Sequence, residues 1–190
     1  MPESEYISKV RLAGFDPSDG LDRGVSRFKE SMWYIVKILF FLTAFPVPQA
    51  IKAVFLSWFG AKVGKGIVIK PRVNIHMPWK LELGDYSWIG EEVFILNFEP
   101  VKIGQNVCIS QRTFLCGGNH DYKDQAFKYR NGPITIHDGA WVAANCFIGP
   151  NVIIGADAAI GAGSVVTTDV EPNSIYKGNP ACRVKSRWND

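Results

Sequence analysis

A histidine stands where the most regular part of the sequence is interrupted. His120 lies in the stretch CGGNHDY (116–122), and the two glycines before it would let the backbone leave a tight array. Histidine titrates near neutrality, so it can take a proton from a hydroxyl group and return one to a leaving thiolate. His120 is therefore a candidate general base, and a surface-loop histidine without a catalytic role is the alternative.

Cys116, four residues before His120, offers different chemistry, because a cysteine can form a covalent acyl-enzyme. The four cysteines of the chain, at positions 108, 116, 146 and 182, form no CxxC pair and no zinc-like cluster with histidine. We expect them to be reduced thiols of a cytoplasmic protein.

The composition is that of one globular domain. The chain has 190 residues, of which 47% are hydrophobic and 21% charged, so it can bury a sizeable core. A net charge of +3 without a run of basic residues gives no support to nucleic-acid binding. The first thirty residues are polar and contain no apolar core of a cleavable signal peptide.

From residue 63 to about 171, an aliphatic residue returns every six positions, often with glycine after it. Fifteen such lead positions are all valine, isoleucine or leucine, at 63, 69, 75, 83, 89, 95, 103, 109, 115, 136, 142, 148, 154, 160 and 166. A period of six fits a solenoid in which each hexad is a short strand and a turn. Three hexads would make one triangular coil, and the glycine would serve an unusual turn or a close backbone approach.

The irregular steps of the repeat all fall on one corner of this triangle. The third lead position of a coil is followed by a step of eight residues at 75–83 and 95–103, and of twenty-one residues at 115–136. The long loop at 116–135 therefore leaves the edge at which the earlier coils are already longer. Such excursions are usually functional, and the rigid coil at the loop's root would hold a general base in place.

Several segments resemble the hexapeptide-repeat sugar O-acetyltransferases, which include maltose, galactoside and Nod-factor acetyltransferases. They are NHDY (119–122), PITI (133–136), AW (140–141) and IGAGSVVTTDVEPNSIYKGNPACRV (160–184). The segment FGAKVGKGIVIKPRVNIHMPWKLELGDYSWIGEEV (59–93) is similar to the WcaF-type branch for colanic acid and other exopolysaccharides. The resemblance spans about residues 24–187. It implies left-handed coils, so the expected fold is all-β, a left-handed parallel β-helix of about five coils with an N-terminal apolar helical segment.

The resemblance also implies roles for single residues. His120 matches the family's catalytic histidine. Asn97, one coil earlier on the same corner, matches an asparagine that orients the acceptor or stabilises a developing oxyanion; without the family, a turn asparagine is an equal interpretation. The positions that match contacts to acetyl-CoA, the expected co-substrate, are Trp141, Ala144, Ala162, Thr167, Thr168 and Arg183.

The CoA-binding pattern departs from the family at two positions. Thr168 stands where a lysine is common, and Ser186 stands where a second arginine is common. Lys185 and Arg187 flank Ser186 and could supply the charge for the CoA phosphates. A packing role for Trp141 and an ordinary solvated basic tail are the alternatives to CoA binding.

A zinc enzyme is a rival on the same architecture. The γ-class carbonic anhydrases share the β-helix and bind zinc through three histidines, and this chain has three, His76, His120 and His137. That class places two of them at a short spacing on neighbouring turns, whereas His120 and His137 are seventeen positions apart. We expect no metal site.

Two apolar segments precede the repeat, MWYIVKILFFLTAF (32–45) and QAIKAVFLSWF (49–59). Pro46 and Pro48 end the first well short of the roughly 20 residues that a membrane-spanning helix needs. One interpretation is a helical pair that caps the open end of the solenoid or packs on another subunit. The other is a hairpin that lies in a membrane surface with its aromatic residues at the headgroups, and the sequence leaves both open.

The sequence thus predicts an N-terminal segment with a helical cap (1–62), the β-helix with its loop (63–171) and a C-terminal tail (172–190). The predicted activity is acetyl-CoA-dependent O-acetylation of a sugar hydroxyl in exopolysaccharide biosynthesis. N-acetylation of an amino sugar and a non-catalytic scaffold docked at a membrane are the alternatives. The family implies a homotrimer. We expect a cytoplasmic protein, and peripheral contact of residues 32–59 with the inner face of the membrane stays open.

Overall fold

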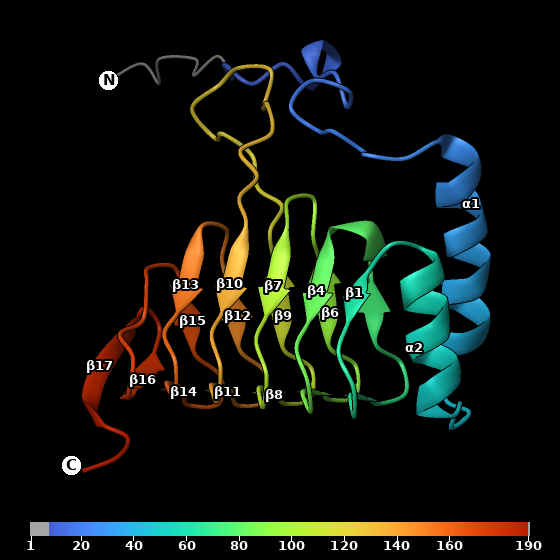
Figure 1. Cartoon of the computed structure of the whole chain (residues 1–190). Helices are drawn as coiled ribbons and strands as arrows, with labels where there is room; N and C mark the ends of the chain where they lie inside the picture. The colour runs from blue at the N-terminus through green and yellow to red at the C-terminus, as the bar shows by residue number, and fades with distance from the viewer. Residues whose placement is uncertain (1–7, 190) are drawn as a thin grey trace, which may run out of the picture.

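Three sheets form the faces of a triangular solenoid, and helices cover one of its ends (Figure 1). The computed structural model describes residues 8–189; the first seven residues of the expected N-terminal segment and Asp190 lie outside the described residues. All pairings between successive coils are parallel, so the solenoid is a parallel β-helix.

Each face of the prism takes one short strand from every coil. In order of pairing, the first sheet contains β1 (Lys62–Val63), β4 (Leu81–Leu83), β7 (Val101–Ile103), β10 (Ile134–Ile136) and β13 (Val152–Ile154). The second contains β17 (Ala181–Ser186), β16 (Ser174–Gly178), β14 (Ala159–Ile160), β11 (Trp141–Val142), β8 (Cys108–Ile109), β5 (Trp88–Ile89) and β2 (Val68–Ile69). The third contains β15 (Val165–Val166), β12 (Phe147–Ile148), β9 (Phe114–Cys116), β6 (Phe94–Leu96) and β3 (Asn74–Ile75). Five complete coils stack, and β16 begins a sixth.

The lead residues fill one continuous core, because each lies opposite the lead residue of the next coil. Leu83 pairs with Ile103, and Ile103 pairs with Ile136 on the far side of the long loop. The loop therefore interrupts the sequence repeat without shifting the register. All lead residues are buried except Val63, which is half-buried at the capped end. Stacking of these aliphatic side chains is the main source of stability in such a solenoid.

The turns between strands are built in the same way in successive coils. A positive φ of between 58° and 61° occurs three residues after a lead position, at Arg72, Glu92, Arg112 and Asn145. Two roles were expected for the glycine directly after a lead residue, an unusual turn or a close backbone approach. The structure shows the second role. A Cβ atom on Gly84 would overlap the backbone of Gly104 in the next coil, so this glycine permits close approach.

The cap consists of α1 (Arg27–Val36), the π-helical turn η2 (Lys37–Phe41) and α2 (Gln49–Trp58). Ser26 begins α1, because its Oγ accepts a hydrogen bond from the Lys29 N–H at 3.3 Å. Two short 3-10 turns complete the helical elements of residues 8–189, η1 (Leu12–Gly14) and η3 (Pro78–Lys80).

Side chains of the cap form hydrogen bonds with backbone groups at the free edge of the first coil. Lys52 Nζ donates to the carbonyl oxygens of Ile69 and Lys70 at 2.9 and 3.1 Å, and the Ile69 N–H donates to Gln49 Oε1 at 2.6 Å. The Trp33 indole N–H donates to the Ile75 carbonyl at 3.1 Å. Covering these groups protects an exposed strand edge, as the capping interpretation predicted. Among residues 8–189, the structure contains no helix of sufficient length and apolarity to cross a membrane.

Candidate active site

The excursion between β9 and β10 is a β-ribbon at its root (Figure 1). The Gly132 N–H donates to the Gly117 carbonyl at 2.9 Å, and His120 pairs with Tyr129 as an antiparallel bridge. A Cβ atom on Gly117 would lie 3.0 Å from the carbonyl oxygens of both Gly132 and Leu96, so glycine suits the point where the chain leaves the coil. The ribbon makes the root of the loop a rigid support for His120.

The imidazole of His120 is held in one tautomer. Its Nδ1 atom lies 2.6 Å from the carbonyl oxygen of Phe127. A carbonyl oxygen can only accept a hydrogen bond, so Nδ1 must carry the proton. In the neutral ring, Nε2 then has the free lone pair, which is the arrangement that a general base requires.

Aromatic rings fix the plane of this imidazole. The Phe127 ring stacks on it at a centroid distance of 4.4 Å and an angle of 12°, and the Tyr129 ring lies at 4.9 Å. Phe127 has a φ of +56°, which is unusual for a bulky residue. Strained backbone of this kind persists where the surrounding structure imposes it, commonly at functional sites. Here it accompanies the turn of the Phe127 carbonyl toward His120.

The N-terminal segment lies against the loop. The Phe15 ring contacts His120 edge-on at 5.5 Å, and the Arg11 N–H donates to the Gln125 carbonyl at 2.7 Å. Asp19 forms an ion pair with Lys128 at 2.9 Å. Sequence reasoning missed Phe15, and it also missed Phe127 and Tyr129. The only signal for them was the presence of aromatic residues in two otherwise polar stretches.

Asn97 occupies an interior position. Its side chain has no exposed surface, its Oδ1 accepts from the Met77 N–H at 2.8 Å, and its Nδ2 donates to the Met77 carbonyl at 2.5 Å. The residue lies next to the loop root, since its Cα is 3.8 Å from the position of a Cβ on Gly117. The amide thus joins two coils, and a contact of Asn97 with an acceptor stays a prediction.

A cleft of about 230 Å³ lies beside the loop root, lined by Asn119, Arg130, Pro150, Asn151 and Thr167. It brings Thr167, predicted to contact the acyl donor, to the residue that precedes His120. Thr168 follows on the same corner and is exposed. The structure therefore places these two predicted residues and the loop root on one edge of the prism.

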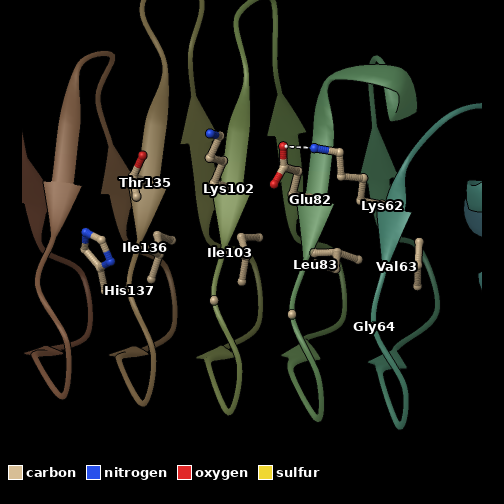
Figure 2. Close-up of a pocket in the computed structure, with 12 residues that line it drawn as sticks. Lys62, Val63, Gly64, Glu82, Leu83, Lys102, Ile103, Thr135, Ile136 and His137 are labelled. Atoms are coloured by element: carbon tan, nitrogen blue, oxygen red, sulfur yellow. Dashed lines mark hydrogen bonds and ion pairs between the residues drawn. The ribbon is translucent and has the colours of Figure 1, made fainter.

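A larger groove, of about 460 Å³, lies elsewhere (Figure 2). It runs along the first sheet, where Lys62 and Glu82 form an ion pair at 2.9 Å and His137 lies at the opposite end. No residue of the ribbon lines it. The smaller cleft is the candidate active site, because Asn119, which lines it, directly precedes the candidate base His120.

Two further residues that are predicted to contact acetyl-CoA lie at the corner between the second and third sheets. Ala144 and Ala162 are stacked one coil apart, since the Gly163 N–H donates to the Ala144 carbonyl at 2.9 Å. Trp141 lies on the second sheet, 45% exposed, and its indole N–H donates to Ser110 Oγ at 3.0 Å. The exposed indole and the small alanines leave this surface open to a ligand.

Two of the three predicted basic residues near the C-terminus, both arginines, already have protein partners. Arg183, on β17, forms an ion pair with Glu171 at 2.9 Å. Arg187 donates to the carbonyl oxygens of Gly139 and Asp157 at 2.9 and 3.3 Å. Lys185, on β17, is exposed. Phosphate binding by these residues stays a prediction, and for the two arginines it would compete with these contacts.

The rival chemistries find little support around the loop. Burial raises the pKa of the Cys116 thiol, whose Sγ donates to the Gly118 carbonyl at 3.1 Å, so the nucleophilic thiolate is disfavoured. Burial, with the nearby charge of Lys37, lowers the pKa of His76. Within the described range, 8–189, no three histidine, cysteine or acidic side chains are grouped as metal ligands would be.

Comparison with known proteins places the chain among enzymes. Residues 133–168 match the family model for bacterial transferase hexapeptide repeats, with six repeats. WcaF of Escherichia coli K12, an acetyltransferase assigned to colanic acid biosynthesis, is 38% identical over 176 residues, which cover 93% of this chain and 96% of WcaF. The chain belongs to the hexapeptide-repeat acetyltransferase family. Galactoside O-acetyltransferase of Escherichia coli K12 is 33% identical over 135 residues, 68% of this chain and 65% of that protein.

Solved structures of this family show the same fold. A hexapeptide-repeat acetyltransferase of Vibrio cholerae, solved with acetyl-CoA, superposes with a TM-score of 0.79 at 24% identity and covers 96% of this chain and 100% of its own. A galactoside acetyltransferase solved with CoA superposes with a TM-score of 0.77 at 24% identity. The match covers 85% of this chain and 82% of that enzyme. The predicted left-handed parallel β-helix and the predicted class, an acyltransferase, are confirmed, and a non-catalytic scaffold does not fit membership of this family.

Proposed function

We propose that this hexapeptide-repeat acetyltransferase transfers the acetyl group of acetyl-CoA to a hydroxyl group of a saccharide, in the biosynthesis of an exopolysaccharide such as colanic acid. The observation that carries the proposal is the contact between His120 Nδ1 and the Phe127 carbonyl at 2.6 Å. It leaves Nε2 as the basic atom, on a ribbon that the solenoid holds rigid.

The reaction needs one proton carrier. His120 Nε2 takes the proton of the sugar hydroxyl while its oxygen attacks the carbonyl carbon of the thioester. The carbon–sulfur bond then breaks, and the imidazolium returns the proton to the thiolate, so that free CoA and an O-acetyl sugar leave. The Phe127 carbonyl holds the Nδ1 proton throughout and stabilises the imidazolium that forms.

Asn97 enters the proposal as a positioning residue. Its two hydrogen bonds to Met77 tie the second coil to the first directly beneath the loop root. This contact would fix the position of Gly117 along the axis of the solenoid, where the chain leaves the coil. It would thereby fix the position of His120. A direct contact of Asn97 with the acceptor or with the oxyanion would require both hydrogen bonds to break.

The choice of a hydroxyl acceptor rests on the relatives. Galactoside O-acetyltransferase, 33% identical, acts on an oxygen by its name, and WcaF is assigned to a polysaccharide. For the donor, we propose that acetyl-CoA runs past Trp141, Ala144 and Ala162 toward Thr167 and Thr168. These side chains are small or exposed, so they leave room for a flexible pantetheine chain.

We further infer a homotrimer in which a neighbouring subunit supplies the second wall of the site. The cleft beside His120 is small, and a prism with flat faces associates readily about a threefold axis. For location, we propose the cytoplasm. All four cysteines are free thiols, as in proteins from a reducing compartment.

Release of free CoA, measured with a thiol reagent against a panel of sugars and oligosaccharides, tests the proposal. We expect acceptor-dependent release, with a product that mild alkali deacetylates, because esters hydrolyse and amides do not. A product that resists alkali would favour N-acetylation of an amino sugar. Acetyl-CoA turnover that no saccharide in the panel stimulates would contradict the proposal.

A further inference from the structure

The helical cap has an exposed apolar face that the core does not use. Its large side chains follow one another at helical spacing along both helices. The set, which we call the cap face, consists of Phe28, Met32, Ile35 and Leu39 on α1 and η2, Phe45 between the helices, and Ile51, Val54 and Trp58 on α2. Trp58 is 72% exposed and Phe45 is 71% exposed. Exposed apolar patches of this kind usually mark a docking surface.

The opposite side of the same helices already makes the contacts that hold the cap. Trp33, Phe41 and Leu56 are buried in the core of the solenoid. The Phe40 and Phe55 rings, 4.6 Å apart, join η2 to α2. On the outer side, a hollow of about 330 Å³ remains among Ala50, Ile51, Val54, Phe55 and Trp58. The cap therefore has two apolar sides, of which one is packed against other residues of the described range, 8–189, and the other is exposed there.

The cap and the first coil are strongly basic. Residues 26–72 contain eight lysines and arginines but one acidic residue, Glu30. Their net charge of +7 contrasts with +3 for the whole chain, so the rest of the chain is net acidic at −4. Four of the eight cations form ion pairs, Arg27 with Glu30, and Lys62, Lys65 and Arg72 with carboxylates of the second coil. Two more, Lys37 and Lys52, are buried, and Lys70 is exposed. When the second-coil partners Glu82, Asp85, Glu91 and Glu92 are counted with residues 26–72, the net charge falls from +7 to +3 and stays positive. These residues form the end of the solenoid that bears α1 and α2 (Figure 1).

We infer that the cap face docks on an anionic lipid bilayer, with the helices lying in the plane of its surface. Apolar side chains and basic residues together are the features of interfacial helices, in which the apolar side enters the headgroup region and the cations contact anionic lipids. Aromatic residues such as Trp58 favour that depth. None of the helices described for this chain is long and apolar enough to span the bilayer, in keeping with a surface orientation.

Charge decides against a second copy of the chain as the occupant. Two cap faces in contact would bring two net positive regions together, and like charges at an interface are costly. An anionic surface instead complements this charge. The inference also extends the proposed function, on which this step rests: an enzyme docked in this way would meet a saccharide that a lipid anchors to the same bilayer.

Vesicle sedimentation of the full chain tests the inference. We expect binding to vesicles of phosphatidylcholine with 30% phosphatidylglycerol, little binding to phosphatidylcholine alone, and weakening in 0.5 M NaCl. The double variant Phe45→Asp/Trp58→Asp should bind at least tenfold more weakly, since both side chains would enter the headgroups. Tyr122→Asp, also at a 71% exposed aromatic residue but on the loop, is the matched control and should bind as the wild type does.

Two results would overturn the inference. One is absence of binding to anionic vesicles, or unchanged binding of the double variant. The other is a larger oligomer without lipid that the double variant dissociates, which would make a second copy the occupant. CoA release with a soluble saccharide acceptor should persist in the double variant. Failure of lipid binding is therefore distinguishable from failure of the proposed activity.

Discussion

The Nδ1 atom of His120 and the carbonyl oxygen of Phe127 lie 2.6 Å apart, and the rings of the same two residues stack at 4.4 Å. Phe127 thus determines the tautomer of the imidazole and, with the ring of Tyr129, its plane. The partner of the candidate base is a backbone carbonyl of its own loop, so the base is assembled when the ribbon folds.

Phe127→Gly should separate the two contributions of Phe127. Glycine accepts a φ of +56°, so the carbonyl can stay in place while the stacked ring is lost. We expect kcat to fall about ten- to hundredfold, because a mobile imidazole is correctly oriented less often, while KM for acetyl-CoA stays unchanged. Steady-state kinetics checks this. Tyr122→Ala, an exposed aromatic position on the same loop, should retain wild-type kcat; an equal loss in both variants would contradict a specific role of Phe127.

Ala162→Arg should obstruct the proposed donor path. Ala162 is exposed at the corner where Ala144 lies one coil earlier, so a large side chain there would meet the pantetheine chain. We expect KM for acetyl-CoA to rise about tenfold or more, the equivalent of about 1.4 kcal/mol. Gln111→Arg, an exposed residue at the same corner one coil before Ala144, is the control. Unchanged KM in Ala162→Arg would remove this corner from the donor site.

Cys116→Ser should leave acetyl transfer largely intact. Burial raises the pKa of Cys116, so at neutral pH the residue is a thiol and a poor nucleophile. Iodoacetamide should accordingly alkylate the exposed Cys182 well before Cys116, as mass spectrometry of peptides can show. An acetyl group found on Cys116 after incubation with acetyl-CoA alone would instead indicate an acyl-enzyme.

Glu92 should make the stability of the solenoid depend on pH. A hydrogen bond from Arg112 Nε at 2.7 Å, together with the charges of Arg112 and Arg72, holds the pKa of Glu92 below its ordinary value. The stabilisation is therefore complete above the unfolded pKa of about 4.3 and is lost as pH falls through the lower folded pKa. Thermal melts should show a higher Tm for the wild type than for Glu92→Gln at pH 6, and the difference should vanish toward pH 3. A difference that persists unchanged at pH 3 would contradict this assignment.

Much of the fold follows from local pattern. The six-residue period needs only that lead residues such as Ile103 and Ile136 face inward, and the eight-residue steps place the loop on one corner. His120 could be chosen for the same reason, because it lies where the period breaks. Two helices before the repeat also follow from two apolar segments with prolines between them, whereas the sequence left open whether these helices cap the solenoid or lie in a membrane surface.

The geometry around His120 could not be predicted, because it depends on contacts between distant segments. Phe15 reaches the imidazole only when the N-terminal segment crosses the loop, and no period in the sequence encodes that crossing. The Phe127 carbonyl turns toward Nδ1 through a left-handed backbone conformation that phenylalanine rarely adopts. The family resemblance predicts that Asn97 orients the acceptor or stabilises an oxyanion. A side-chain amide is equally suited to the two hydrogen bonds with the Met77 backbone that the structure shows.

The kcat of His120→Ala, with acetyl-CoA and an accepted saccharide, shows whether His120 is the general base. The variant should first be shown to match the wild type in Tm and in oligomeric state. We expect kcat of this variant to fall about 10²- to 10⁴-fold, which is the usual contribution of a general base. KM for acetyl-CoA should stay within about twofold of the wild-type value. A folded His120→Ala variant that acetylates at the wild-type rate would contradict it.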